Sequence, residues 1–385
     1  MKKVLVVLQV LCKCLPLMYG NMDFFRKGDI VLNVTVIGAG NSGLAMAAHL
    51  SSEGNNVTLW NRTSSNIEKL IETNTIRCEG VIQGDVKIDK VTDDIKLAVS
   101  NPDVIFITTP ANSHKELAKL IAENLQKQTL ILLNPGRTFG ALEFLKEFRK
   151  YNKSFQQSVA ETQTIVYTCR RTGENSVNII SLKSDVLLST FDPKENENII
   201  QRLPYCLQQY FIPAKSMIET SIGNVGMVLH CAPLLLNSGW TEAKESTYKY
   251  YYDGITRSIG NFIEKIDEER IAVSEILGLK VESTKEWLMR TYQVQGNSIF
   301  ECIQNNKAYK TIDAPSSINH RYILEDVPCG LVPIEFIGKK YGLPMKNTEI
   351  VINLASALLE IDFRESGRKI DYLTEMKELG IGQVY

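Results

Sequence analysis

The sequence predicts an α/β protein in which an N-terminal, doubly wound parallel sheet, extended by antiparallel strands, is followed by an all-α second domain. Three observations support this fold class. Short apolar runs alternate with helical patterns in the first third of the chain, a glycine-rich turn joins the first run to the first helix, and the apolar spacing after Asp192-Pro193 is mostly helical. A length of 385 residues exceeds what one core usually supports, so two domains are expected.

The first strand, Val31–Ile37, leads directly into a glycine-rich turn and then into the helical stretch Leu44–Leu50. Val57–Trp60 forms the second strand. A glycine turn that leaves a strand, opens a helix and reaches a second strand is typical of a Rossmann-type unit, because the free N–H groups of the helix bind the pyrophosphate of a dinucleotide. We therefore expect cofactor contacts from the six turn residues Gly38, Ala39, Gly40, Asn41, Ser42 and Gly43.

The end of the second strand indicates which dinucleotide is bound. Enzymes that use NAD usually place a carboxylate there to accept hydrogen bonds from the ribose hydroxyls, whereas this chain has Asn61, Arg62 and Thr63. An amide, a guanidinium and a hydroxyl can all donate to a 2′-phosphate. The tripeptide predicts a preference for NADPH, with NAD as a possible cofactor; the alternative is that these residues form a solvated turn.

Two further buried strands are predicted at Asp103–Pro110 and Thr129–Asn134, with a helix at Lys115–Leu125 between them. Ligands of parallel sheets bind at the carboxyl ends of the strands. Pro110 and Asn134, in the loops that follow these two strands, are therefore expected to lie on the nicotinamide side of the cofactor.

Four short strands are predicted next, at 158–164, 166–170, 177–182 and 185–190, and we expect them to extend the sheet in mixed fashion. The predicted domains are an N-terminal extension (1–30), the dinucleotide-binding domain (31–192) and an α-helical domain that binds substrate (193–385). The cleft between the last two is the expected active site.

The composition excludes several kinds of partner. The net charge is −1, which gives no electrostatic reason to expect binding to nucleic acid or a membrane surface. The eight cysteines form no C-x-x-C pair or cluster with histidine, so we expect a reducing compartment and no metal. Residues 1–21 imitate an export signal but lack its cleavage site, so Met22 is the expected start; the alternative is a genuine export signal. Because NADPH is found in the cytosol, the cytoplasm is the expected location.

Four histidines could supply an acid/base group. We expect His49 and His114 to be structural and His320 to be exposed. His230 lies in the apolar segment Ile222–Leu234 near the start of the helical region, where the residues alone favour a buried core histidine over a catalytic one.

Several motifs follow one another along the chain. They are Asn134-Pro135-Gly136-Arg137-Thr138 with Ala141–Phe144, Ala160-Glu161-Thr162 with Tyr167 and Cys169-Arg170, Gly223-Asn224 through His230 and Pro233, His320-Arg321-Tyr322, Glu325-Asp326-Val327-Pro328 and Gly330–Pro333. In these motifs and their order, the chain from Leu32 to Arg368 resembles the opine dehydrogenases, the octopine/nopaline dehydrogenase family.

The resemblance implies that an amino acid condenses with a 2-oxo acid and that hydride from NADPH reduces the imine to a secondary amine dicarboxylate. It also implies that His230 and Asp326 form the acid/base pair and that Arg321 binds the 2-oxo acid carboxylate. Glu161 and Tyr167 are candidates for contacts with the amino acid, although both could equally be structural. The expected partners are small molecules, and the protein is expected to be a monomer or a homodimer.

Two other functions fit parts of the sequence. A 2-oxo acid reductase of the ketopantoate reductase or glycerol-3-phosphate dehydrogenase kind shares the two-domain plan but depends on a lysine early in the helical domain. No lysine occurs between Lys215 and Lys244, where His230 stands instead. An NADP-binding sensor without turnover would lack the acid/base residues. Cys329 departs from the family pattern, and the sequence leaves the two substrates and the product stereochemistry open.

Overall fold

The centre of the N-terminal region is an eight-stranded sheet with the strand order β12-β11-β8-β7-β6-β1-β2-β5. Neighbouring strands pair in parallel except β11, which is antiparallel to β8. The strands are β1 (Asn33–Ile37), β2 (Asn56–Trp60), β5 (Lys90–Thr92), β6 (Val104–Ile107), β7 (Leu130–Leu133), β8 (Ser158–Thr162), β11 (Val186–Thr190) and β12 (Phe211–Pro213). This computed structural model describes residues 30–154, 157–245 and 247–380, so the predictions for residues 1–21 and Met22 lie outside the described residues.

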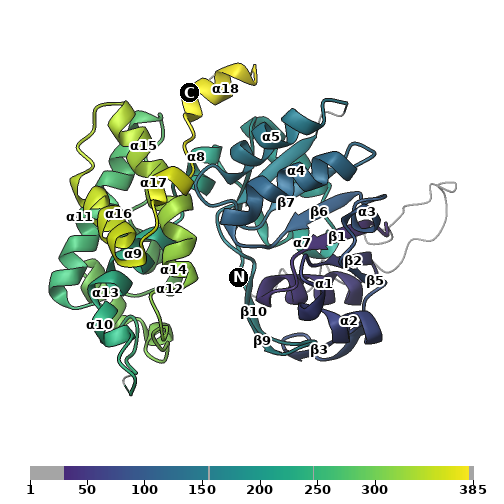
Figure 1. Cartoon of the computed structure of the whole chain (residues 1–385), viewed down its shortest axis with the longest axis horizontal. Coiled ribbons are helices and arrows are strands. Elements are labelled where there is room, and N and C mark those ends of the chain that lie inside the picture. The colour runs from purple at the N-terminus through teal and green to yellow at the C-terminus, as the bar shows by residue number, and fades with distance from the viewer. Residues whose placement is uncertain (1–29, 155–156, 246, 381–385) are drawn as a thin grey trace, which may run out of the picture. The chain divides into compact units, whose positions relative to one another are not determined.

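Helices cover both faces of this sheet, as expected for a doubly wound fold. Alternate residues of one strand enter different cores: Val36 packs with α1 (Asn41–Ser52), whereas Ile37 packs with α4 (His114–Asn124) and α5 (Gly140–Tyr151). Helices α4 and α5 lie side by side (Figure 1). The N-terminal region also contains the short helices α2 (Glu68–Thr73) and α3 (Ile95–Ala98). The predicted parallel, doubly wound architecture is therefore confirmed.

A second sheet was not predicted. It has the order β4-β3-β10-β9 and consists of β3 (Thr75–Gly80), β4 (Gly84–Lys87), β9 (Tyr167–Gly173) and β10 (Ser176–Leu182). The expectation that β9 and β10 extend the main sheet is wrong. Their inward residues, such as Val177 and Ile179, pack in the same core as α1, and the alternation that marks a half-buried strand does not say which sheet the strand joins.

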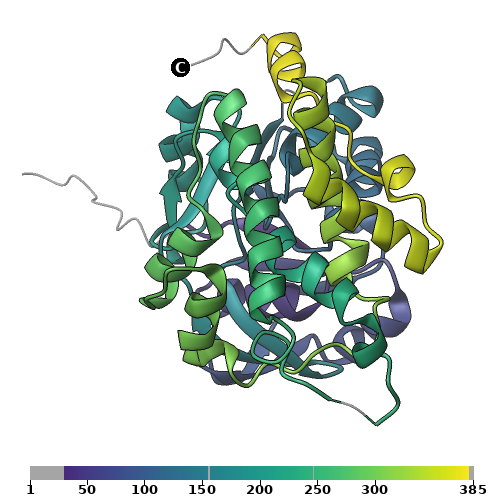
Figure 2. The ribbon, with the colours of Figure 1, turned by 90° about the vertical axis from the view of Figure 1, so that its left-hand side faces the viewer.

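The main sheet continues beyond Asp192-Pro193, the expected boundary between the domains. After this dipeptide the chain forms α6 (Asn196–Gln201) and α7 (Tyr205–Gln208), and then returns to the sheet as β12, which pairs with β11. We call the described residues up to Pro213 the sheet half and those from Ala214 the helical half. The long helix α11, in green, runs through the helical half (Figure 2). The helices of this half are α8 (Met217–Ser221), α9 (Gly226–Leu236), α10 (Ser238–Thr241), α11 (Arg257–Ile276), α12 (Thr284–Tyr292), α13 (Ile299–Asn305), α14 (Arg321–Leu324), α15 (Val332–Lys340), α16 (Lys346–Leu359), α17 (Phe363–Ser366) and α18 (Tyr372–Glu378).

The helical spacing of apolar residues that was expected after Asp192-Pro193 corresponds to the two longest helices of this half. The apolar residues from Ile255 to Ile266 fall mainly on α11, whose Ile263, Ile266 and Val273 are buried, and those from Glu349 to Phe363 fall mainly on α16. Both helices pack against each other and against α9. None of the helices in the described part of the chain is long and apolar enough to cross a membrane.

Candidate functional site

The glycine turn between β1 and α1 has the geometry that a dinucleotide requires. Gly38 has φ +105°, which side chains rarely adopt, and a Cβ on Gly43 would lie 1.7 Å from the carbonyl oxygen of Gly38. A Cβ on Gly40 would meet no atom within 4 Å. The turn therefore needs Gly38 and Gly43 for its own packing, whereas Gly40 leaves space on the outer side of the turn, where a pyrophosphate fits.

Side chains from three elements support this turn. The amide N–H of Ala39 donates to Asn61 Oδ1 at 3.2 Å, and Asn41 Oδ1 accepts from the backbone N–H of Arg171 at 2.9 Å. Arg171 on β9 also donates from Nη1 to the Ala39 carbonyl at 3.2 Å. Ser42 lies in the first turn of α1, where it hydrogen-bonds to Cys169. Arg171 was not predicted from the sequence, because its position depends on the second sheet.

The residues at the end of β2 were expected to donate hydrogen bonds to a 2′-phosphate, and the structure leaves only some of them available for this. The amide of Asn61 is occupied inside the turn, since its Nδ2 donates to the Thr63 carbonyl at 3.0 Å. Arg62 pairs with Glu116 on α4 at 2.6 Å, and both side chains are about two-thirds exposed (65% and 63%). An ion pair so exposed contributes roughly 0–1 kcal/mol, so the guanidinium of Arg62 can exchange Glu116 for another anion at little cost.

A cavity of about 520 Å³ adjoins the turn, and its lining includes Ser65, Asn66, Lys69 and Arg171. It also carries the carboxylates of Glu68, Glu72 and Glu174. The cavity is therefore polar but not uniformly basic, which suits the ribose and base of an adenosine better than a phosphate.

The loops after β6 and β7 lie at the carboxyl edge of the sheet, as predicted. Pro110 precedes Ala111, whose amide N–H donates to Glu325 Oε1 at 3.2 Å. Asn134 is fully buried; its Oδ1 accepts from Thr162 at 3.1 Å, and its Nδ2 has no hydrogen-bond partner among the described residues. Because this amide is fully buried, its contact with a cofactor stays a prediction.

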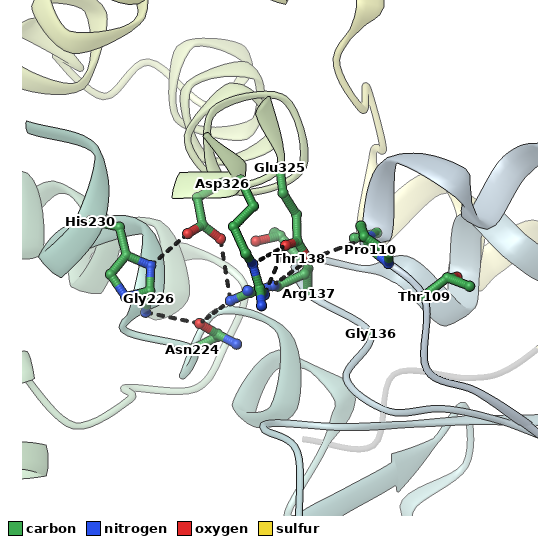
Figure 3. Close-up of polar contacts among 12 residues, drawn as sticks. Thr109, Pro110, Gly136, Arg137, Thr138, Asn224, Gly226, His230, Glu325 and Asp326 are labelled. Carbon is green, nitrogen blue, oxygen red and sulfur yellow. Dashed lines mark hydrogen bonds and ion pairs between the residues drawn. The ribbon is translucent and has the colours of Figure 1, made fainter. Parts of the chain in front are cut away.

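His230 and Asp326 come together in the structure. Nδ1 of His230, on α9, lies 2.7 Å from Oδ2 of Asp326 (Figure 3). Asp326 is the second residue after the end of α14, and Glu325 is the first. The imidazole also stacks on Tyr322, with ring centroids 3.9 Å apart and planes 9° apart. The side chain of His230 is 19% exposed and that of Asp326 is 2% exposed. A buried carboxylate on Nδ1 fixes the tautomer and leaves Nε2 as the nitrogen that exchanges a proton.

Arg137 joins this pair from the sheet half, and the sequence did not single it out. Its Nη1 lies 3.2 Å from Asp326 Oδ1 and donates to Asn224 Oδ1 at 3.2 Å, and its Nε donates to Glu325 Oε1 at 3.1 Å (Figure 3). Burial alone would raise the pKa of Glu325, but the neighbouring arginine guanidinium groups lower it to about 2. The carboxylate is therefore ionised at neutral pH.

Arg321 lies where a substrate carboxylate could reach it. Its Nη2 is 2.9 Å from Glu325 Oε2, and 47% of its side chain is exposed. The guanidinium thus has one side held by Glu325 and another side accessible to solvent. This arrangement fits the predicted hold on a carboxylate.

Two candidates for substrate contacts are instead structural. Both carboxylate oxygens of Glu161 are occupied: Oε2 accepts from the Ala141 amide at 2.9 Å, and Oε1 accepts from the hydroxyls of Thr220 and Ser221. Burial raises the pKa of Glu161 to about 6. Tyr167 is buried in the core against α1, where its hydroxyl lies 3.0 Å from Nδ1 of His49. Both side chains are buried and contact other residues of the protein, so the structure does not place them as the expected substrate contacts.

The other histidines are not placed for acid/base catalysis. His49 and His114 are buried, as expected, and burial lowers the pKa of His114 to about 3. His320 is half-buried rather than exposed, because its Nδ1 caps α14 by accepting from the Tyr322 amide at 3.3 Å. Within the described ranges, no group of three or more His, Cys, Asp or Glu side chains could hold a metal ion.

Comparisons with known proteins agree with this arrangement. The family model described as NAD/NADP octopine/nopaline dehydrogenase, alpha-helical domain, matches residues 213–359, and the one described as ketopantoate reductase PanE/ApbA matches residues 34–162. Among solved structures, octopine dehydrogenase in complex with NADH and agmatine has a TM-score of 0.72 at 18% identity and covers 92% of this chain and 99% of that one. Yersinopine dehydrogenase with NADP+ bound has a TM-score of 0.70 at 13% identity, covering 90% and 97%.

These structures share the fold, and a sequence relative shows the family. An opine dehydrogenase from Arthrobacter sp. (strain 1C) is 35% identical over 339 residues, which are 88% of this chain and 94% of that protein. The chain therefore belongs to the opine dehydrogenase family of NAD(P)-dependent dehydrogenases.

Proposed function

We propose that the protein condenses an amino acid with a 2-oxo acid and reduces the resulting imine to a secondary amine dicarboxylate, with NADPH preferred over NADH. The observation that carries the proposal is the contact of 2.7 Å between His230 and Asp326, with Arg321 five residues before Asp326. A proton-transfer pair beside a partly exposed guanidinium is what a carboxylate-bearing carbonyl substrate requires.

In the proposed reaction the amine adds to the carbonyl carbon of the 2-oxo acid, and loss of water gives an imine. NADPH, when bound at the glycine turn, would supply the hydride that reduces the imine carbon. Arg321 holds the carboxylate of the 2-oxo acid. Nε2 of His230 transfers protons to and from the carbinolamine oxygen and the amine nitrogen, while Nδ1–H donates to Asp326 and keeps the ring in one orientation.

The structure also bears on the reductase alternative. The ketopantoate reductase model matches only residues of the sheet half, where the cofactor-binding unit is common to many dehydrogenases. The helical half carries the acid/base residues, and it matches the octopine/nopaline model. His230 occupies the segment in which the reductases have their lysine. These observations favour imine reduction over carbonyl reduction.

We expect NADPH oxidation to require both a 2-oxo acid and an amino acid. The test is a matrix of 2-oxo acids, each assayed with and without each amino acid, with His230→Ala protein as the control for a contaminating reductase. Full-rate oxidation with a 2-oxo acid alone, giving a 2-hydroxy acid, would contradict imine reduction and support the reductase alternative.

The cofactor preference depends mainly on Arg62, because the amide of Asn61 is already used within the turn. We expect Arg62→Ala to weaken NADPH binding by about 10-fold, the equivalent of one exposed charge-assisted contact, and to leave NADH binding unchanged. Adding Asn61→Asp should reverse the preference. Dissociation constants measured by cofactor fluorescence check this.

Lys119 is a matched control for this test, because it is also an exposed cation with a weak ion pair, to Glu123, and it lies on α4 near the Glu116 that pairs with Arg62. Lys119→Ala should leave both dissociation constants unchanged. Equal or tighter binding of NADH by the unaltered protein would show that Arg62 does not select the 2′-phosphate.

A further inference from the structure

Arg137 belongs to the sheet half by sequence but contacts the proton-transfer pair of the helical half. Its loop follows β7, and its side chain is 10% exposed. The guanidinium contacts Glu325, Asp326 and Asn224, which lie 188, 189 and 87 residues further along the chain. Figure 3 shows it between Asp326 and Glu325. One buried cation thus connects the nucleotide-side loop to the residues that hold His230.

Two features of the backbone accommodate this guanidinium. Arg137 has φ +59°, a left-handed conformation that side chains disfavour. Gly226, at the start of α9, has no Cβ, and a Cβ there would lie 2.8 Å from Nη1 of Arg137 and 3.0 Å from Oδ1 of Asn224. Strain of this kind persists where the surrounding contacts enforce it, and it is found at functional sites.

The contacts divide the two oxygens of Asp326 between two partners. Oδ1 faces Nη1 of Arg137, and Oδ2 faces Nδ1 of His230. Glu325 is shared in the same way, between Nε of Arg137 and Arg321. Removing Arg137 would leave two adjacent buried carboxylates with Arg321 and His230 as their remaining cationic partners, an arrangement that drives one carboxylate to take up a proton or to rotate.

The loop that carries Arg137 is itself fixed. Arg368, fully buried and paired with Glu143, donates from Nη1 to the Thr138 carbonyl at 2.6 Å, and the Thr138 amide donates to the Cys329 carbonyl at 3.3 Å. The same loop contains Asn134, whose free amide nitrogen lies on the expected cofactor side. A shift of this loop would therefore move Arg137 and, through it, Asp326.

We propose that Arg137 is a positioning residue that holds Asp326 oriented on His230, and so connects the proton-transfer pair to the nucleotide-side loop. The proposal rests on the proposed function for its kinetic consequences. The hydrogen bond that Arg137 imposes between Asp326 and His230 exists without substrate, so it can be measured independently of activity.

The test compares Arg137→Met, Arg137→Lys and Arg270→Met. Arg270 is the matched control, since it is also a fully buried arginine, paired with Asp267, and it contacts neither Asp326 nor His230.

We expect Arg137→Met to lower kcat by about 10²-fold, the effect of misplacing a reacting group by about 1 Å, with little change in the dissociation constant of NADPH. Arg137→Lys, which keeps the charge but not the planar fork, should recover part of that loss. Arg270→Met should lower stability and spare the kcat of the folded protein.

A second readout is the proton resonance of His230 Nδ1–H, assigned by its loss in His230→Ala. It should shift or broaden in Arg137→Met and stay in place in Arg270→Met. An unchanged resonance together with an unchanged kcat in Arg137→Met would overturn the proposal. If Arg137→Met does not fold, a wild-type kcat and resonance in Arg137→Lys would overturn it. If the resonance shifts in Arg137→Met but the unaltered protein condenses no pair of substrates, the positioning role is supported and the proposed function is refuted.

Discussion

Asp326→Asn is expected to lower kcat by about 10²- to 10⁴-fold while the affinity for NADPH stays near that of the wild type. Asparagine has the shape of aspartate but cannot stabilise the imidazolium, and its amide can impose the wrong tautomer on His230. His230→Ala should cost at least as much. The double variant should lose little more than the worse single variant, because residues that act as one unit are not additive.

The matched control is Asp267→Asn, which alters another buried carboxylate of the helical half, one that pairs with Arg270 and not with His230. It should reduce stability without changing the turnover of folded molecules. Rates are measured per folded molecule, after circular dichroism has established the folded fraction. Independent losses that multiply in the double variant would show that His230 and Asp326 do not function as a pair.

The two glycines of the turn are expected to differ sharply when each is changed to alanine. Gly43→Ala places a methyl group 1.7 Å from the Gly38 carbonyl oxygen, so the backbone must move. We expect a loss of about 1–3 kcal/mol or more in stability and no measurable cofactor binding. Gly40→Ala meets no atom within 4 Å, so its melting temperature should match the wild type.

Gly40→Ala should nevertheless weaken cofactor binding by at least about 10-fold, since its methyl group would occupy the space that the pyrophosphate needs. Thermal melts and cofactor titrations of the two variants separate packing of the turn from binding. Wild-type affinity in Gly40→Ala would mean that the pyrophosphate does not lie against this residue.

Local sequence patterns predicted the part of the fold that local physics controls. The turn from Gly38 to Gly43 and the apolar runs of β6 and β7 each specify their own structure, because the glycine conformation and the burial of both strand faces depend on nearby residues. The contact between His230 and Asp326 was expected only from resemblance. The two residues are 96 positions apart, and no periodicity connects them.

Residues whose position depends on distant packing were missed or misassigned. The motif around Arg137 was noted, but the sequence does not reveal a left-handed arginine opposite Gly226. Tyr167 and Glu161 were candidates because the expected extension of the sheet would place them near the cleft, yet the second sheet turns Tyr167 towards α1, and Thr220 and Ser221 hydrogen-bond to Glu161. In each case the deciding neighbour is more than 50 residues away in sequence.

The proposed site forms a bond between two substrates and does not only reduce one. This is tested by mass spectrometry of the product formed from NADPH, a 2-oxo acid and an amino acid that carries a heavy nitrogen isotope. We expect one secondary amine that contains both carbon skeletons and the labelled nitrogen. An unlabelled 2-hydroxy acid as the only reduced product, with the amino acid recovered intact, would contradict it.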